Sequence, residues 1–271
     1  MSVDDKRKKM TVPDIVRMKE KGEKIAVLTA YDFLTAQLQD SAGIDIILVG
    51  DSAGMVVAGY ETTLPVTMEV MLHHVASAKR GIRYALLVAD MPFLSYQTGL
   101  DNAIMNAGRF LKESGAEAVK LEGGEVVAET ISRMVRFGIP VMGHLGLTPQ
   151  SIHAFGGYHL IGNEEKTAKM LIENAKILEQ AGVFSLVLEK VPAQVAREIT
   201  AAVSVPTIGI GAGKFCDGQV LVSHDMLGLF DKFKPRFVRR YADLGKIMHD
   251  AFDHYRGDVK SGKFPSDDES Y

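Results

Sequence analysis

Continuous apolar runs recur along this chain, and segments with helical periodicity separate them. Almost every residue within a run is apolar, rather than every second one, which is typical of strands buried on both faces of a parallel sheet. Parallel strands need long crossover connections, and the intervening helical segments supply them. The predicted strands lie at 25–31, 44–50, 85–89, 118–122, 141–145, 185–189, 207–210 and 219–223.

The helical segments complete an alternating pattern. A short helix is predicted at 11–22, where Thr11 can cap it, Pro13 suits its first turn and Gly22 can end it. A longer helix is predicted at 237–260, after the last strand. The other predicted helices lie at 33–43, 67–80, 99–114, 125–137, 166–181 and 192–202.

This alternation predicts an α/β chain that forms a (β/α)8 or TIM barrel with a short N-terminal helix and a C-terminal helix. The length of 271 residues is ordinary for one such barrel, so we expect residues 1–271 to form a single domain. A doubly wound open sheet is the rival architecture. It would spread the strand ends along an edge, whereas a barrel brings them all to one mouth.

Five of the apolar runs finish on a residue that can bind a metal ion or move a proton, and this repetition favours the barrel. "IILVGD" ends on an acid, and so do "ALLVAD", "AVKLE" and "SLVLE", while "IPVMGH" ends on a histidine. In a barrel, these side chains would converge on the carboxyl-terminal face, where TIM-barrel enzymes have their active sites. The five residues are Asp51, Asp90, Glu122, His144 and Glu189.

Two long connections are predicted on the same face. Residues 52–66 follow the second strand, and residues 146–164 follow the fifth. Loops of this length inside a compact domain are usually functional or disordered. The second loop is rich in aromatic residues and glycine, so we interpret it as a lid or binding loop, with a merely flexible connection as the alternative.

Asp51, Asp90 and Glu122 come from the second, third and fourth strands, which are neighbours in a barrel that winds in order. Carboxylates that share one mouth repel each other unless a cation or protons intervene. A set of oxygen ligands suits Mg²⁺ or Mn²⁺ better than Zn²⁺. The alternative for any single acid is that it caps a helix or forms a turn, but the recurrence at matching positions favours a metal site.

Two basic residues lie beside these acids. Lys120 is two positions before Glu122, so both share one face of a strand, where the lysine can balance the acids or bind an anionic substrate. His144 is open to three interpretations: substrate donor, metal ligand or hydrogen-bonded core histidine. We favour the substrate donor, because the site already has enough oxygen ligands.

Bulk properties exclude several classes of protein. The net charge of −3 argues against a nucleic-acid binder, and no apolar stretch approaches the length of a membrane span. The N-terminus has no apolar core after its charges, so we expect no secretory signal. Cys216 is the only cysteine, which fits a reducing compartment, and we treat it as structural. We therefore expect a cytoplasmic protein that binds neither nucleic acid nor membrane.

Seven sequence blocks run in order along the chain: "LVGDSAGM", "TTLPVT", "LLVADMPF", "VKLEGG", "GHLGLTPQS", "LVLEKVP" and "IGIGAGKFCDGQVLV". Part of the last block, "GIGAGKFCDG", superficially resembles a dinucleotide fingerprint, but no ribose-binding acid follows it, so a tight turn at the barrel rim is the preferred interpretation. In order and spacing, the seven blocks together closely resemble the 3-methyl-2-oxobutanoate hydroxymethyltransferase family, also called ketopantoate hydroxymethyltransferase. The resemblance covers roughly residues 11–265.

The resemblance implies a (β/α)8 barrel that transfers a one-carbon unit from 5,10-methylenetetrahydrofolate to 3-methyl-2-oxobutanoate. The product is 2-dehydropantoate, in the first committed step towards pantothenate and coenzyme A. It implies one Mg²⁺ per subunit, a cytoplasmic location and a homo-oligomer, usually a decamer. It also implies site residues: Asp51, Asp90 and Glu122 for the metal, Asp51, Ser52, Asp90, Lys120 and His144 for the keto acid, and Glu189 as general base.

The chemistry of a 2-oxo acid is consistent with this assignment. Its carboxylate and keto oxygens can chelate one metal ion, which stabilises the enolate, and a carboxylate base can remove the neighbouring proton. Two alternatives remain: a Mg²⁺-dependent enolate lyase of the isocitrate lyase kind, for which Cys216 is the only candidate reactive cysteine, and a non-catalytic metal or keto-acid binding protein. Glu189, an acid beyond those needed for binding, argues against the second.

Overall fold

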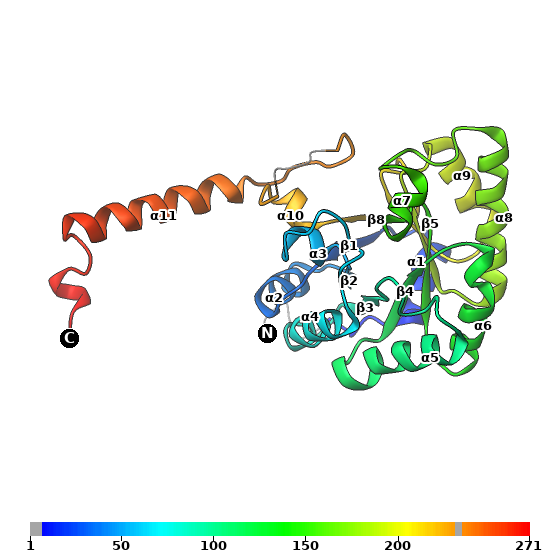
Figure 1. The fold of residues 1–271 in the computed structure, drawn as a ribbon, viewed down its shortest axis with the longest axis horizontal. Helices are drawn as coiled ribbons and strands as arrows, with labels where there is room; N and C mark the ends of the chain where they lie inside the picture. Colours follow the sequence, from blue (N-terminus) through cyan, green and yellow to red (C-terminus); the bar gives the residue numbers. More distant parts are fainter. Residues whose placement is uncertain (1–6, 231–234) are drawn as a thin grey trace. The chain divides into compact units, whose positions relative to one another are not determined.

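The structure is a computed structural model that describes residues 7–230 and 235–271 (Figure 1). The described residues form two compact units, one that ends at Leu221 and one that begins at Val222. The first unit contains all the strands and the candidate site. The second contains two helices and a short 3₁₀ turn. No described helix is long and apolar enough to cross a membrane.

Within the described residues of the first unit, eight parallel strands form a closed barrel in sequence order, and β8 pairs with β1. This confirms the predicted (β/α)8 barrel and excludes the open sheet. Every predicted strand is present, and its ends lie within two residues of the expected ones. The strands are β1 Ile25–Thr29, β2 Ile46–Val49, β3 Leu86–Asp90, β4 Ala118–Glu122, β5 Val141–Gly146, β6 Ser185–Glu189, β7 Thr207–Ile210 and β8 Gly218–Leu221.

Helices connect the strands of the first unit, except that residues 211–217 link β7 to β8 without one (Figure 1). The long predicted loops each contain short helical turns: α3 follows β2, and η4 and α7 follow β5. The helices and turns are α1 Val12–Glu20, α2 Phe33–Ala42, α3 Ala53–Val56, α4 Met68–Gly81, α5 Leu100–Arg109, η2 Phe110–Ser114, η3 Glu125–Val127, α6 Ala128–Arg136, η4 Pro149–Ser151, α7 Ile152–Phe155, α8 Glu165–Ala181 and α9 Ala193–Ala202.

Local capping explains where several helices begin and end. Thr11 forms a capping box with Asp14 at the start of α1. Asp32 accepts a hydrogen bond from the Thr35 N–H at the start of α2. The same helix ends at Gly43, whose φ of 92° lies in the left-handed region that favours glycine.

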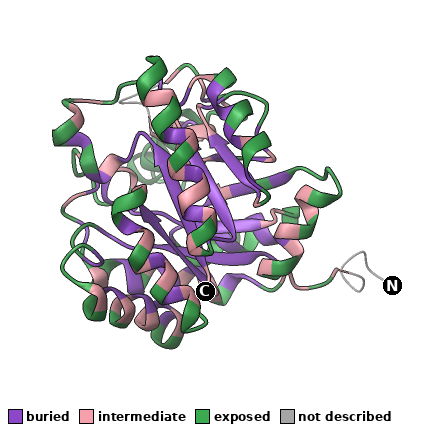
Figure 2. Ribbon diagram, turned by 90° about the vertical axis from the view of Figure 1, so that its right-hand side faces the viewer, coloured by how far each residue is buried: buried purple, intermediate pink, exposed green. Residues whose placement is uncertain are grey.

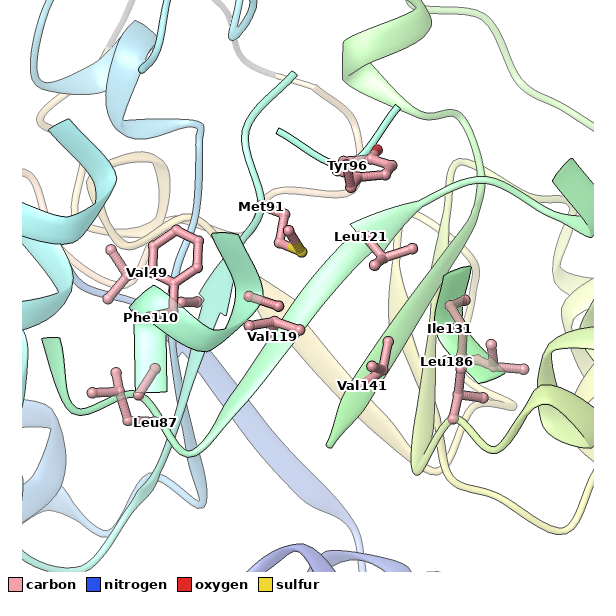
Figure 3. Packing of buried hydrophobic residues seen from close by; sticks show 14 of the residues in the cluster. Val49, Leu87, Met91, Tyr96, Phe110, Val119, Leu121, Ile131, Val141 and Leu186 are labelled. Carbon is pink, nitrogen blue, oxygen red and sulfur yellow. The ribbon is translucent and has the colours of Figure 1, made fainter. Parts of the chain in front are cut away.

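Alternate strand residues bury into two separate apolar clusters. On β2, Ile46 and Leu48 belong to the cluster inside the barrel, whereas Ile47 and Val49 pack between barrel and helices. Strands β2 to β7 are therefore buried on both faces, as their continuous apolar runs predicted, whereas Ala26 on β1 and Gln219 on β8 are exposed (Figure 2). Figure 3 shows part of the outer cluster, where Phe110 at the end of α5 lies among strand residues.

Three predicted helices differ from the sequence prediction. The segment predicted as one helix over 125–137 begins as the 3₁₀ turn η3 and is α-helical only from Ala128. The segment predicted as one helix over 99–114 is an α-helix to Arg109 and then the π-helical turn η2. In the second unit, α10 spans Ser223–Met226, α11 spans Leu244–Ser261 and η5 spans Asp267–Glu269. The prediction that the last helix begins at 237 was wrong.

The late start of α11 is explained by hydrogen bonds to an earlier segment of the chain. The backbone N–H groups of Tyr241 and Leu244 donate to the carbonyls of Met226 and Leu227. The segment before α11 is therefore engaged with the end of α10, which prevents those N–H groups from joining a helix that started earlier.

Candidate active site

The barrel brings the five predicted strand-end residues to one face. Asp90, Glu122 and Glu189 are the last residues of β3, β4 and β6, while Asp51 follows β2 by two residues. The strand register sets Glu122 opposite His144, and Asp90 opposite Lys120. The predicted convergence at the carboxyl-terminal mouth is therefore present in the structure.

Lys120 and the acids on β2 and β3 form the first half of the site. The Lys120 Nζ lies 2.9 Å from Asp90 Oδ1, and both side chains are buried. The backbone N–H of Asp51 donates to Asp90 Oδ2 at 3.1 Å. A lysine thus balances one carboxylate of the group, and the second carboxylate lies beside it on the neighbouring strand.

His144 joins the acids of β4 and β6. Its Nδ1 lies 3.5 Å from Glu122 Oε1 and 3.2 Å from Lys120 Nζ. Its Nε2 lies 3.3 Å from Glu189 Oε2. The imidazole therefore stands between two carboxylates, one of which is Glu189, the residue predicted to be the base.

Burial and crowding shift the pKa of several groups. Desolvation, followed by the charges of Asp90 and Glu122, raises the pKa of Asp51 to about 8. Burial also raises the pKa of Asp90, although Lys120 opposes this. Burial alone would lower the pKa of Lys120, but the Asp90, Glu122 and Asp51 carboxylates together raise it. These acids therefore resist ionising together, while the lysine stays charged.

The pKa of His144 reflects the same competition. Burial and the charge of Lys120 lower it, whereas the Glu122 and Glu189 carboxylates raise it, and the net pKa shift is upward. The histidine is thus biased towards the protonated form, in which both ring nitrogens donate hydrogen bonds.

Ser52 lies at the rim of this group. Its Oγ is 2.9 Å from the Tyr31 hydroxyl. Space beside it is tight: a Cβ at Gly50 would lie 2.7 Å from Ser52 Oγ and 3.3 Å from Asp90 Oδ2. The glycine before Asp51 therefore allows the backbone to pass close to these polar groups.

Sequence reasoning missed two residues of the site, Tyr96 and Gln150. The side chain of Gln150, in η4, donates to Asp51 Oδ2, and its backbone N–H donates to Glu122 Oε2. The Tyr96 hydroxyl donates to Gln150 Oε1 at 2.8 Å. Gln150 lies in the loop singled out for its length, so that length was a usable signal. No sequence pattern marked Tyr96.

The loop at 146–164 extends over the mouth between two other connections. The Tyr158 hydroxyl lies 3.6 Å from Met55 Sδ, after β2, and Lys190 Nζ donates to the Tyr158 carbonyl at 2.6 Å. Burial, followed by the charges of Glu189 and Asp51, raises the pKa of Tyr158. The loop therefore lines the site, as predicted, and its motion as a lid stays a prediction.

The chemistry of the acids fits a hard divalent cation. Three buried carboxylates face one lysine, and burial together with repulsion from neighbouring carboxylates raises the pKa of Asp51 and Asp90. A cation relieves such crowding. Among the residues that the structure describes, no three His, Cys, Asp or Glu side chains form a ready-made metal cluster. Mg²⁺ usually binds through one or two carboxylates and keeps several waters, so it does not need one.

Comparison with known proteins gives the family. The family model described as ketopantoate hydroxymethyltransferase matches residues 9–267. The chain belongs to this family. It is 57% identical over 272 residues to the 3-methyl-2-oxobutanoate hydroxymethyltransferase of Christiangramia forsetii, covering all of both chains. It is 56% identical to the protein of the same name from Caldicellulosiruptor saccharolyticus, covering 97% of this chain and 99% of the other. The resemblance seen in the sequence is confirmed.

Solved structures agree on the fold. The chain is similar to 2,3-dimethylmalate lyase, a member of the PEP mutase/isocitrate lyase superfamily, with a TM-score of 0.60 and 15% identity. The match covers 96% of this chain and 91% of that one. At this identity the likeness extends to the barrel alone.

Cys216 argues against the lyase alternative. It is buried, and burial raises the pKa of its thiol. Its Sγ packs so closely that a Cβ at Gly209 would lie 3.0 Å from it. An inaccessible, protonated thiol is a poor nucleophile or acid, so the only candidate for a reactive cysteine is structural.

Proposed function

We propose that the barrel mouth transfers a one-carbon unit from 5,10-methylenetetrahydrofolate to 3-methyl-2-oxobutanoate, giving 2-dehydropantoate. The observation that carries this proposal is the buried group of acids with one lysine, linked through His144 to Glu189. Such a group can bind a cation and an anionic keto acid on one side and offer a base on the other. The names of the relatives support the same reaction.

Asp51, Asp90 and Glu122 would hold the cation, which we propose is one Mg²⁺ per subunit. When bound, Mg²⁺ would act as a Lewis acid that polarises the keto carbonyl, an effect worth several kcal/mol. Its charge would also favour the ionised forms of Asp51 and Asp90, whose pKa is raised by burial first and by neighbouring carboxylates second.

Lys120, Ser52 and His144 would bind the keto acid. The raised pKa of Lys120 keeps its ammonium charged at neutral pH, so it can attract the substrate carboxylate or the negative charge that develops on the keto oxygen. The upward shift in the pKa of His144 favours a second donor at the same place. Ser52 adds a hydroxyl whose position is set by Tyr31.

Glu189 would be the general base. Its side chain is 17% exposed, more than the other acids of the group, and it faces His144 from the end of β6. It would remove the proton from C3 of the keto acid, and the C–H electrons would move towards the keto oxygen. The resulting carbon nucleophile would attack the folate methylene, forming a C–C bond. One water supplies the hydroxyl group and tetrahydrofolate leaves.

Membership of the family is the basis for three further proposals. The chain would work in the cytoplasm, would assemble as a homo-oligomer, specifically a decamer, and would use residues 1–271 as one functional barrel domain. Sedimentation of the purified protein at several concentrations tests the assembly.

Two assays test the proposed function. Product formation should require 5,10-methylenetetrahydrofolate, whereas a lyase of the isocitrate lyase kind would turn over without it. Solvent deuterium should enter C3 of 3-methyl-2-oxobutanoate in the presence of enzyme and Mg²⁺, which a non-catalytic binding protein would not achieve. Product without folate, or absence of both exchange and product, would contradict the proposal.

A further inference from the structure

Gln150 connects carboxylates that come from different strands. Its backbone N–H donates to Glu122 Oε2 at 3.0 Å, and its Nε2 donates to Asp51 Oδ2 at 2.9 Å. The same Nε2 also donates to the Met91 carbonyl at 2.9 Å. One buried residue on the loop after β5 thus contacts an acid that follows β2 and an acid on β4.

The chemistry of its partners fixes the orientation of the Gln150 amide. A backbone carbonyl can only accept, so the atom that faces Met91 must be the nitrogen. The amide oxygen then faces the Tyr96 hydroxyl at 2.8 Å and Gln97 Nε2 at 3.3 Å, both of which can donate. Every donor and acceptor of the amide therefore has a partner, and one N–H must point at Asp51.

This arrangement restricts both carboxylates. With Oδ2 held by the amide, Oδ1 is the oxygen that Asp51 offers to a ligand. With Oε2 of Glu122 held by the backbone, Oε1 is directed to the side where His144 lies, 3.5 Å away. Fixed carboxylates lose less freedom when they bind a cation than mobile ones do.

We propose that Gln150 is a positioning residue that preorganises Asp51 and Glu122 for a divalent cation, and that Tyr96 holds its amide in place. This inference rests on the proposed function, since it concerns the same acids. Partners that orient metal ligands typically contribute 10- to 100-fold to metal affinity. The competing interpretation is that Gln150 merely satisfies the Met91 carbonyl and stabilises the fold.

The chain offers a matched control. Gln39 is also buried, and its Nε2 donates to the Thr29 carbonyl at 2.8 Å, which is a backbone group rather than a carboxylate of the site. Gln39→Met and Gln150→Met each remove a buried amide and keep a similar volume. Only the second removes a donor to Asp51.

The test measures Mn²⁺ binding by electron paramagnetic resonance, together with the thermal unfolding of each variant. We expect Gln150→Met to weaken Mn²⁺ binding about 10-fold and to raise the Mg²⁺ concentration for half-maximal activity by a similar factor. We expect kcat at saturating Mg²⁺ to change less than about threefold, because the general base is untouched. Gln39→Met should lower the unfolding temperature without changing Mn²⁺ affinity.

A second variant keeps the test decisive if Gln150→Met does not fold. Tyr96→Phe deletes one oxygen and should weaken Mn²⁺ binding about threefold. The hydroxyl also accepts from the Glu122 backbone N–H at 3.2 Å, so the double variant separates the two routes: little further loss when both changes are combined is expected if Tyr96 acts through the Gln150 amide. Wild-type Mn²⁺ affinity in folded Gln150→Met would overturn the inference. If Gln150→Met does not fold, wild-type Mn²⁺ affinity in Tyr96→Phe would overturn it. So would an equal loss of affinity in Gln39→Met.

The wild-type protein separates this inference from the proposed function. If it binds Mn²⁺ but makes no product, the proposed function fails, and the variants still decide the role of Gln150. If it makes product but binds no divalent cation, the one-carbon transfer stands. The metal part of the proposal and this inference then both fail.

Discussion

The two ends of the barrel both bury charged side chains, but the partners of these charges differ. At the amino-terminal end, Asp40 accepts hydrogen bonds from three consecutive backbone N–H groups, those of residues 83–85. There too, Lys19 donates to the carbonyls of Thr200, Val203 and Val205 and pairs with Asp217. These charged side chains therefore hold neighbouring segments of the chain together through hydrogen bonds to backbone groups.

At the carboxyl-terminal mouth, charged side chains mainly face one another. Lys120 pairs with Asp90, and His144 stands between Glu122 and Glu189. More acids than bases gather there, and burial, followed by the charges of Asp90 and Glu122, raises the pKa of Asp51 to about 8. The excess of carboxylates at this end can therefore be balanced by a cation, or by a cation that carries an anionic substrate.

The difference separates structural from functional charge. A charge paired with backbone stabilises the fold and has little capacity left for a ligand. A charge paired with other titratable side chains is costly to the fold and responsive to binding. Variants of matched residues at the two ends test this distinction between structural and functional charges.

The largest contrast is expected for two aspartates. Asp51→Asn should reduce activity about 10²-fold or more by weakening Mg²⁺-dependent binding of the keto acid, while unfolding stability stays equal or rises. Asp40→Asn should lower the free energy of unfolding by about 1–3 kcal/mol, because three backbone N–H groups lose a charged acceptor. The Asp40 variant should keep wild-type kcat per folded molecule. Chemical denaturation and steady-state assays with Mg²⁺ titration measure both, and a reversal of the two phenotypes would refute the comparison.

Two lysines give the next contrast. Lys120→Met should lower kcat/KM about 10²-fold with the fold retained, since the substrate's developing charge loses its partner. Lys19→Met should instead lower the free energy of unfolding, by about 1–3 kcal/mol, with kcat/KM nearly unchanged. If Lys120→Met unfolds the protein without a specific kinetic defect, Lys120 is a structural counter-charge.

The pH dependence of stability sharpens the comparison further. The pKa of Asp51 is raised from 3.8 to about 8 in the metal-free protein. The folded state therefore keeps a proton that the unfolded chain has lost, and the resulting stabilisation is full below 3.8 and disappears as the pH rises to about 8. We expect the unfolding temperature measured with a chelator to fall over this window.

Two controls accompany that measurement. Asp51→Asn should remove this part of the fall. Added Mg²⁺ should stabilise the protein more as the pH rises, because a cation binds only the ionised carboxylates. If the unfolding temperature of wild-type protein with a chelator depends on pH in the same way as that of Asp51→Asn, the raised pKa of Asp51 is contradicted.

The smallest effect is expected for Cys216. Cys216 belongs to neither of the two groups of charged side chains. Cys216→Ala removes one buried sulfur and should lower the free energy of unfolding by about 1 kcal/mol. Activity should stay within about twofold of wild type, as measured by product formation. Loss of activity in a folded Cys216→Ala variant would revive the lyase interpretation.

The barrel was predictable because its signals are local. Runs such as Ile46–Val49 are apolar at every position, and segments with helical periodicity separate most of them. The acids at the strand ends were predictable for the same reason, since the fold alone brings strand ends together. Neither prediction required knowledge of contacts between residues that are far apart in the sequence.

The parts that sequence missed depend on such contacts. Tyr96 and Gln150 meet because two loops cross the mouth, and no periodicity records that meeting. The start of α11 depends on hydrogen bonds from Tyr241 and Leu244 back to α10. In both cases the decisive partner is far away in sequence and leaves no local pattern.

The central claim is that Glu189 is the base of a site whose other acids hold the cation. Exchange of the C3 proton of 3-methyl-2-oxobutanoate with solvent deuterium, followed by NMR without folate, tests it most directly. We predict that Glu189→Gln loses exchange by about 10²-fold or more while its affinities for Mg²⁺ and the keto acid stay close to wild type. Exchange at the wild-type rate in this variant would contradict the account, and His144, which contacts Glu189, would be the next residue to test.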